Sequence, residues 1–228
     1  MFIACLKRIG RGLTVLLLAL AGYALARSLI AIPLEFSRTA TVIPGSLGFA
    51  GGILVFALIC RFLPLYIFGH EFTHWLVAKL FRRRTGALSV RRDSGSIEVE
   101  KPNIWITLAP YIVPLYALLW LLFVAIPVFL WPELTRHPAF VRTASAMTGF
   151  TYAYHFVLTL EALLRGQEDV VSNGPVLSLT LIVCGNLAFL YVGLLTASHQ
   201  WPEGLAMLRF HVTEQWRFFL TLFPNLLP

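Results

Sequence analysis

Long apolar runs, separated by short polar segments, are the feature that most constrains how this sequence of 228 residues can fold. Only 13% of the residues are charged, whereas a water-soluble domain usually carries about 25%. Such a chain has too little polar surface to cover a globule in water, and a run of about twenty apolar residues can cross a bilayer. The sequence therefore predicts an all-α polytopic membrane protein surrounded by lipid.

The apolar runs predict about five to six transmembrane helices. We expect an N-terminal transmembrane anchor at 1–34, a membrane-embedded core at 48–197 and an amphipathic C-terminal helix at 198–228. The first run is similar to a signal peptide with a cleavage site at Ala24-Leu25-Ala26, but it continues to Leu34, which favours an uncleaved anchor. Within the core, further spans are expected at 104–131, 139–164 and 175–197.

The stretch 48–81 is longer than one bilayer crossing, and Arg61 and Pro64 interrupt it. It is either one tilted helix kinked at Pro64 or a pair of helices with a break there. Arg82–Arg84 follow it, and a basic cluster marks the cytoplasmic side. One long helix places this cluster on the same side as the basic residues before the first span, and this agreement favours a single helix. A polar loop is expected before it, at 33–47.

The segment after the basic cluster predicts a short β-hairpin at the membrane surface. Two runs typical of strands, Ala87–Arg91 and Ser96–Glu100, flank the turn-forming residues Asp93-Ser94-Gly95. An edge strand at this place can hold an extended peptide through main-chain hydrogen bonds.

Charge and cysteine content exclude some classes of site. The net charge is +7, but the basic residues cluster beside apolar spans and no nucleic-acid-binding motif is present, so nucleic acid is not an expected partner. The three cysteines are odd in number and far apart. This pattern favours neither a disulfide framework nor a zinc site made of cysteines.

One short motif inside an apolar stretch carries chemistry: His70-Glu71-Phe72-Thr73-His74. Residues four apart on a helix point the same way, so His70 and His74 can bind one zinc ion. Glu71 then lies beside the ion, where it can take a proton from water and return it to a leaving amine. Two histidines and a glutamate are costly in an apolar helix unless they have partners. The motif therefore predicts Zn2+ as the cofactor and Glu71 as the catalytic base.

A catalytic zinc site usually has three protein ligands, so a third ligand must come from elsewhere in the chain. The candidates near the inner side of the membrane are Asp169, Glu161 and His155. Asp169 follows the fourth span at the depth expected for the histidine pair. Glu161 is a weaker candidate, because an ion pair with Arg165 at i,i+4 explains it.

Residues 48–178 resemble the site-2 protease family of intramembrane zinc metalloproteases, in its compact bacterial form. The residues that carry the resemblance are Gly69 to His74, Ala78, Leu108-Ala109-Pro110-Tyr111, His155, Thr159, Gln167-Glu168-Asp169, Gly174 and Ser178. The resemblance implies that Asp169 is the third metal ligand, because that family places an aspartate near the inner end of a later helix. Two departures from the family stand out: Val170, rather than glycine, follows Asp169, and no PDZ domain is inserted.

Three more polar residues lie in predicted spans. His155 and Thr159 are four apart and share a helix face, where they can line an active-site cavity, bond the zinc ligands, steady an oxyanion or bond a neighbouring helix. Asn186 is either a helix-packing residue or a substrate contact.

Together these features predict hydrolysis of a peptide bond in or near a transmembrane segment of a membrane-protein or peptide substrate. The expected place is a bacterial inner membrane, with the active site near the cytoplasmic face. The alternatives are a zinc-binding membrane protein without peptidase activity and a metal transporter. Glu71 disfavours the first alternative, and the presence of a single histidine cluster disfavours the second and also a di-iron hydroxylase. The sequence defines neither the substrate nor the oligomeric state.

Overall fold

The computed structural model describes residues 2–32 and 39–222, and helices make up most of these residues. This confirms the predicted all-α class. The chain divides into two compact units, Met1–Phe36 with Val176–Pro228, and Ser37–Pro175. By this division, the fifth apolar run is grouped with the N-terminal helix.

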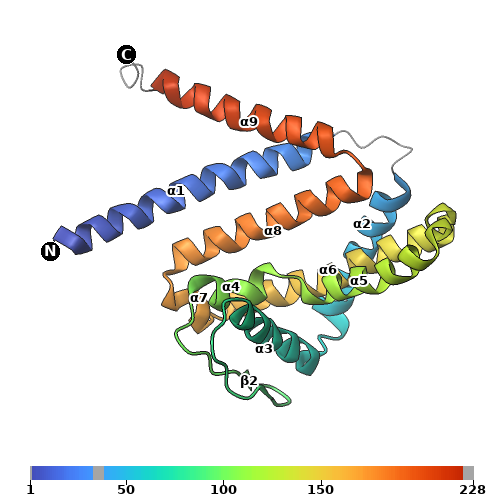
Figure 1. The fold of residues 1–228 in the computed structure, drawn as a ribbon, viewed down its shortest axis with the longest axis horizontal. Coiled ribbons are helices and arrows are strands. Elements are labelled where there is room, and N and C mark those ends of the chain that lie inside the picture. Colours follow the sequence, from blue (N-terminus) through green and yellow to red (C-terminus); the bar gives the residue numbers. More distant parts are fainter. Residues whose placement is uncertain (1, 33–38, 223–228) are drawn as a thin grey trace. The chain divides into compact units, whose positions relative to one another are not determined.

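Within the described residues, the first unit is made of three helices (Figure 1), namely α1 (Phe2–Ala31), α8 (Pro175–Ser198) and α9 (Trp201–Leu222). Its buried apolar cluster contains Ile32, Tyr191 and Leu195. Ser28 on α1 and His211 on α9 are both buried, and the Ser28 Oγ atom lies 3.0 Å from His211 Nδ1. This polar contact joins the first and last helices of the unit.

The second unit contains the motif residues. Its elements, in chain order, are α2 (Thr39–Leu54), the π-helical turn η2 (Val55–Ile59), α3 (Leu63–Leu80), β1 (Ser89–Val90), β2 (Gly95–Ser96), α4 (Ile104–Ile112), α5 (Leu115–Leu130), the 3-10 turn η3 (Pro132–Arg136), α6 (Pro138–Leu164) and α7 (Glu168–Ser172).

The stretch 48–81 is not one helix, so the expectation of a single long helix is wrong. The helical chain stops at Cys60, whose backbone is extended, and Phe62 adopts a left-handed conformation with φ 43° before α3 begins. Pro64 explains the break, because proline has no N–H group to continue a helix and is favoured in the first turn of a new one. Arg61, at the break, pairs with Glu161 of α6 at 2.7 Å.

The expected polar loop at 33–47 is also wrong for its second part, because α2 already begins at Thr39; residues 33–38 lie outside the described residues. Close packing against α6 accounts for this early start. Gly149 of α6 lies against the backbone of Gly45, and Gly48 lies against the backbone of Ala146. The contact of two helix backbones outweighs the cost of Pro44 inside α2.

The apolar segment 104–131 is a pair of helices that meet at an angle of 68°. The break falls at Val113 and Pro114, because the residue before a proline avoids the helical conformation and Val113 is extended. Among the described residues, three helical segments are long and apolar enough to cross a bilayer, and the bent pair α4–α5 raises this to up to four, which does not confirm the expected five to six; the three are Arg8–Ala31, Thr41–Ile59 and Pro175–Ser198. These helices agree with an integral membrane protein.

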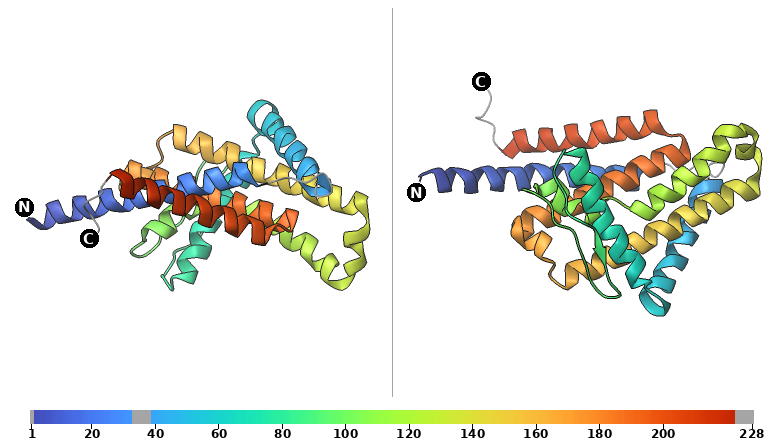
Figure 2. Two further views of the ribbon diagram at one scale, coloured as in Figure 1. Left: turned by 90° about the horizontal axis from the view of Figure 1, so that it is seen from above. Right: turned by 60° about the horizontal axis from the view of Figure 1, so that its bottom comes forward.

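The polar segment after α3 folds back on itself. β1 and β2 pair antiparallel, with Val90 opposite Gly95, and the Arg91 amide donates to the Ser94 carbonyl at 2.7 Å. Thr85 and Val99 form a separate antiparallel bridge. The paired strands are shorter than the runs expected from sequence. Both strands contact α3, and the thin green ribbon of this segment runs along α3 in Figure 2.

Candidate metal centre

Helix α3 carries the motif on two neighbouring stripes of its surface. Tyr66, His70 and His74 are spaced by four residues and form one stripe. Ile67 and Glu71 form the next, rotated by one residue. The ring centroids of His70 and His74 are 4.9 Å apart, and their side chains are only 11% and 10% exposed. The local helix therefore brings both imidazoles to one buried point.

A backbone carbonyl fixes the tautomer of His74. Its Nδ1 atom lies 2.7 Å from the carbonyl oxygen of Ile106 in α4. A carbonyl oxygen only accepts hydrogen bonds, so Nδ1 carries the proton and the neutral ring presents its lone pair at Nε2. Pro110 is the reason that the Ile106 carbonyl is free to accept this bond. In a regular helix the Ile106 carbonyl would bond the amide of residue 110, and proline has none.

Asp169 completes the group from a distant part of the chain. It lies in the first turn of the short helix α7, and α4 holds α7 in place through two side chains one turn apart. Tyr111 donates to Asp169 Oδ2 at 3.2 Å, and Asn173 donates to Thr107 Oγ1 at 2.8 Å. Helix α4 therefore contacts both parts of the site, bonding His74 through its backbone and Asp169 through a side chain.

The three side chains meet with the spacing that a tetrahedral zinc ion requires. The Nε2 atoms of His70 and His74 are 3.3 Å apart, and Asp169 Oδ2 lies 3.6 Å from the first and 3.4 Å from the second. Zinc bonds of about 2.0–2.1 Å to nitrogen or oxygen require ligand atoms about 3.3–3.4 Å apart. The donor set, two imidazoles and a carboxylate, is also one that zinc uses in catalytic sites. The residues present therefore fit the ion.

The charge state of Asp169 suits this role. Burial opposes ionisation of its carboxyl group, but hydrogen bonds and charge interactions with His70 and His74 outweigh burial and hold the pKa of Asp169 below its ordinary value. The side chain is consequently an ionised carboxylate at neutral pH, which is the form that binds a metal.

Glu71 does not contribute to the three-atom group, but it is close to it. Its half-buried carboxyl group interacts electrostatically with His70, His74 and Asp169. The backbone of β2 at Gly95 lies against the Glu71 side chain.

The structure does not bring the other predicted residues into this group. His155 and Thr159 are buried on α6, where the His155 ring lies 5.9 Å from that of Tyr152. Glu161 forms ion pairs with Arg61 and Arg165, so its charge is already matched. Asn186 belongs to α8 of the other unit and donates to the Ile182 carbonyl at 2.9 Å.

Two tyrosines next to the group were not predicted from sequence as site residues. Tyr111 bonds Asp169 and also stacks edge-on against His70, with ring centroids 5.2 Å apart. The Tyr66 hydroxyl lies 3.5 Å from His70 Nδ1. The four-residue spacing of Tyr66 from His70 was a usable signal. No local signal connects Tyr111 with Asp169, because 58 positions separate them.

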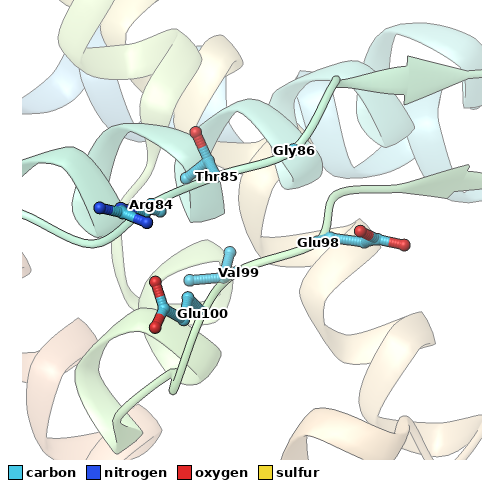
Figure 3. Close-up of a pocket in the computed structure, with 6 residues that line it drawn as sticks. All are labelled: Arg84, Thr85, Gly86, Glu98, Val99 and Glu100. Atoms are coloured by element: carbon cyan, nitrogen blue, oxygen red, sulfur yellow. The ribbon is translucent and has the colours of Figure 1, made fainter.

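An open hollow of about 350 Å³ lies elsewhere, at the base of the hairpin (Figure 3). Its lining includes acidic, basic and apolar residues, and none of them belongs to the candidate metal group, by which we mean His70, His74 and Asp169; the lining residues are Arg84, Thr85, Gly86, Glu98, Val99 and Glu100. The hollow and the buried group on α3 and α7 are therefore lined by different residues.

Comparison with protein-family models, with curated proteins and with solved structures finds no match to this chain.

Proposed function

We propose that the protein is an intramembrane zinc metalloprotease, similar to the site-2 protease family, that hydrolyses a peptide bond in or near a transmembrane segment of another membrane protein. The observation that carries this proposal is the triangle of His70 Nε2, His74 Nε2 and Asp169 Oδ2, with edges of 3.3–3.6 Å, beside Glu71. Three ligand atoms on one side of an ion leave a fourth position open, as in catalytic rather than structural zinc sites.

The chain's own residues divide the work of hydrolysis. His70, His74 and Asp169 would hold the ion, and the ion, when bound, would polarise the scissile carbonyl and make water more acidic. Glu71 accepts the proton of the attacking water and then donates it to the leaving nitrogen. Tyr111 and the Ile106 carbonyl hold Asp169 and His74 in orientation.

The distribution of arginines supports a cytoplasmic position for the site. Arg61 precedes α3, and Arg82–Arg84 follow it. Basic residues next to apolar helices favour the cytoplasmic side. A helix with arginines at both of its ends therefore keeps both ends on that side and does not cross the bilayer. We therefore infer five crossings, by α1, by α2 with η2, by the bent pair α4–α5, by α6 and by α8. With the N-terminus inside, α3 and α7 both lie on the inner side.

The decisive experiment measures bound zinc and peptide cleavage together for protein purified in detergent. Glu71→Gln should keep its zinc and lose cleavage of a transmembrane peptide by about 100-fold or more, since a general base contributes about 10²–10⁴ in rate. Glu98→Gln, which removes an exposed carboxylate of the hairpin, is the matched control and should retain activity. Cleavage by Glu71→Gln at the wild-type rate would exclude the proposed role of Glu71.

The same preparation tests the ligands and the competing functions. Asp169→Asn should lower zinc occupancy, whereas Glu161→Gln should not. If Glu161→Gln lowers it instead, the third ligand is misassigned. Zinc flux into liposomes that survives Glu71→Gln, without cleavage by the wild type, would favour a transporter.

A further inference from the structure

The paired strands lie on the stripe of α3 that carries Glu71. Residues 67 and 71 are four apart and share a helix face, and both strands contact α3. Ile67 is buried at this contact, and Glu71 is half-buried. The Glu71 side chain therefore lies against the β2 backbone at Gly95, and its carboxylate interacts electrostatically with His70, His74 and Asp169.

Gly95 allows β2 to come this close. A Cβ atom placed on Gly95 would lie 2.5 Å from Cγ2 of Ile67 and 2.8 Å from Cγ of Glu71. Both atoms belong to inner parts of their side chains, so neither can swing away at low cost. Gly95 has no positive φ angle, so an alanine would suit the backbone conformation. The glycine is required here for space alone.

We infer that Gly95 is a positioning residue for the general base. The β2 backbone forms one wall of the space available to the Glu71 side chain and so limits the rotamers that this side chain can adopt. The inference rests on the proposed function, because it assigns Glu71 a base role. It adds that the hairpin and the base form one unit, so that displacing the hairpin also misplaces the carboxylate.

The test compares Gly95→Ala with Gly86→Ala. Both variants add one methyl group to the same segment, but the methyl at position 86 meets Glu98 of the segment itself at 3.3 Å and does not touch α3. Gly95→Ala should lower kcat by about 100-fold, the scale expected for a misplacement of about 1 Å. KM and zinc affinity should change by less than about threefold, because the metal ligands and the rest of the substrate path are untouched. Gly86→Ala should retain kcat.

A second readout does not depend on activity. Arg91 and Arg92 are exposed in the turn and are sites for trypsin, so Gly95→Ala should be nicked there about tenfold faster than wild type in metal-free protein. Adding Ile67→Ala removes one of the two clashing atoms and should slow the nicking again. Equal kcat values for the two glycine variants, or equal nicking rates, would overturn the inference. If the wild type cleaves no peptide, the proposed function fails, and the trypsin comparison alone still decides whether Gly95 seats the hairpin on α3.

Discussion

Tyr111 is the side chain that joins two of the three residues of the metal group. It bonds Asp169 Oδ2 through its hydroxyl and packs the edge of its ring against His70. The whole side chain is buried, so the hydroxyl hydrogen bond is shielded from water and its loss would not be replaced at low cost. Asp169 comes from a five-residue helix, and such a short element needs a partner to fix its carboxylate.

Replacing Tyr111 with phenylalanine should weaken metal binding while leaving the fold intact. The ring contact with His70 remains, but the bond to Asp169 is lost, and loss of such a supporting bond typically lowers metal affinity about 10–100-fold. Competition with a zinc chelator measures the affinity, and the visible spectrum of the cobalt-loaded protein reports the geometry. Tyr191→Phe, which removes a buried hydroxyl in the other unit, should leave both unchanged. An unaltered affinity for Tyr111→Phe would show that α7 holds Asp169 unaided.

The sequence alone was sufficient for residues whose arrangement depends only on their spacing within one helix. The spacing of His70 and His74 within one helix already fixes a shared face, so the pair could be predicted without a fold. Asp169 required the resemblance, because no spacing rule connects it with the histidines. The contacts of Ile106 and Tyr111 depend on how α4 packs against α3 and α7, and such packing is a tertiary property with no local pattern. Pro110 would have pointed to a free carbonyl at Ile106 only once the helix register was known.

At the scale of elements, the contact between α2 and α6 is the tightest in the second unit. Glycines on both helices allow the backbones to touch, and Gly52 also packs directly on Ala153. In lipid, where apolar side chains gain little by leaving their surroundings, such close packing is a main source of helix association. Phe56, Tyr154 and Leu158 continue the same contact as a buried cluster next to the break before α3. The start of the motif helix therefore depends on this packing.

Two glycine variants of α2 should separate close packing from helix propensity. Gly48→Ala places a methyl group against the backbone of Ala146, with Cα of Ala146 only 2.9 Å from the added atom, and should destabilise the protein by about 1–3 kcal/mol. Gly51→Ala meets nothing within 4 Å and should be neutral or stabilising by up to about 1 kcal/mol. Thermal unfolding in detergent measures both. Equal melting temperatures for the two variants would contradict a backbone contact at Gly48.

The element predictions failed where proline and packing compete. Pro64 and Pro114 ended helices, whereas Pro44 and Pro110 lie inside helices. The difference is not visible locally, because each proline costs one hydrogen bond and the surroundings decide whether that cost is offset. At Pro44 the close contact with α6 offsets it, and at Pro110 the freed Ile106 carbonyl bonds His74 instead. The runs at 12–32 and 175–197 agree with candidate spans of the structure, Arg8–Ala31 and Pro175–Ser198.

At the scale of the whole molecule, the site is predicted to lie on the inner side of the bilayer with or without the break before α3. The break changes only the reason for that prediction. A single helix over 48–81 would have carried the chain inward and ended at Arg82–Arg84. With the break, the candidate span ends at Ile59, and arginines lie at both ends of α3. If α3 stays on the inner side, the two histidines and the loop that contains Asp169 remain on the same side of the bilayer.

This orientation predicts which positions an impermeant maleimide can reach from each side. With Cys5, Cys60 and Cys184 replaced by serine, single cysteines can be introduced at three exposed sites, as Ser94→Cys, Thr135→Cys and Ser172→Cys. The first and third should react only in inverted membrane vesicles, and the second only in intact cells. The reverse pattern, with the first and third reacting only in intact cells and the second only in inverted vesicles, would mean that α3 crosses the bilayer. A metal group shared by α3 and α7 would then not lie at the inner face of the membrane.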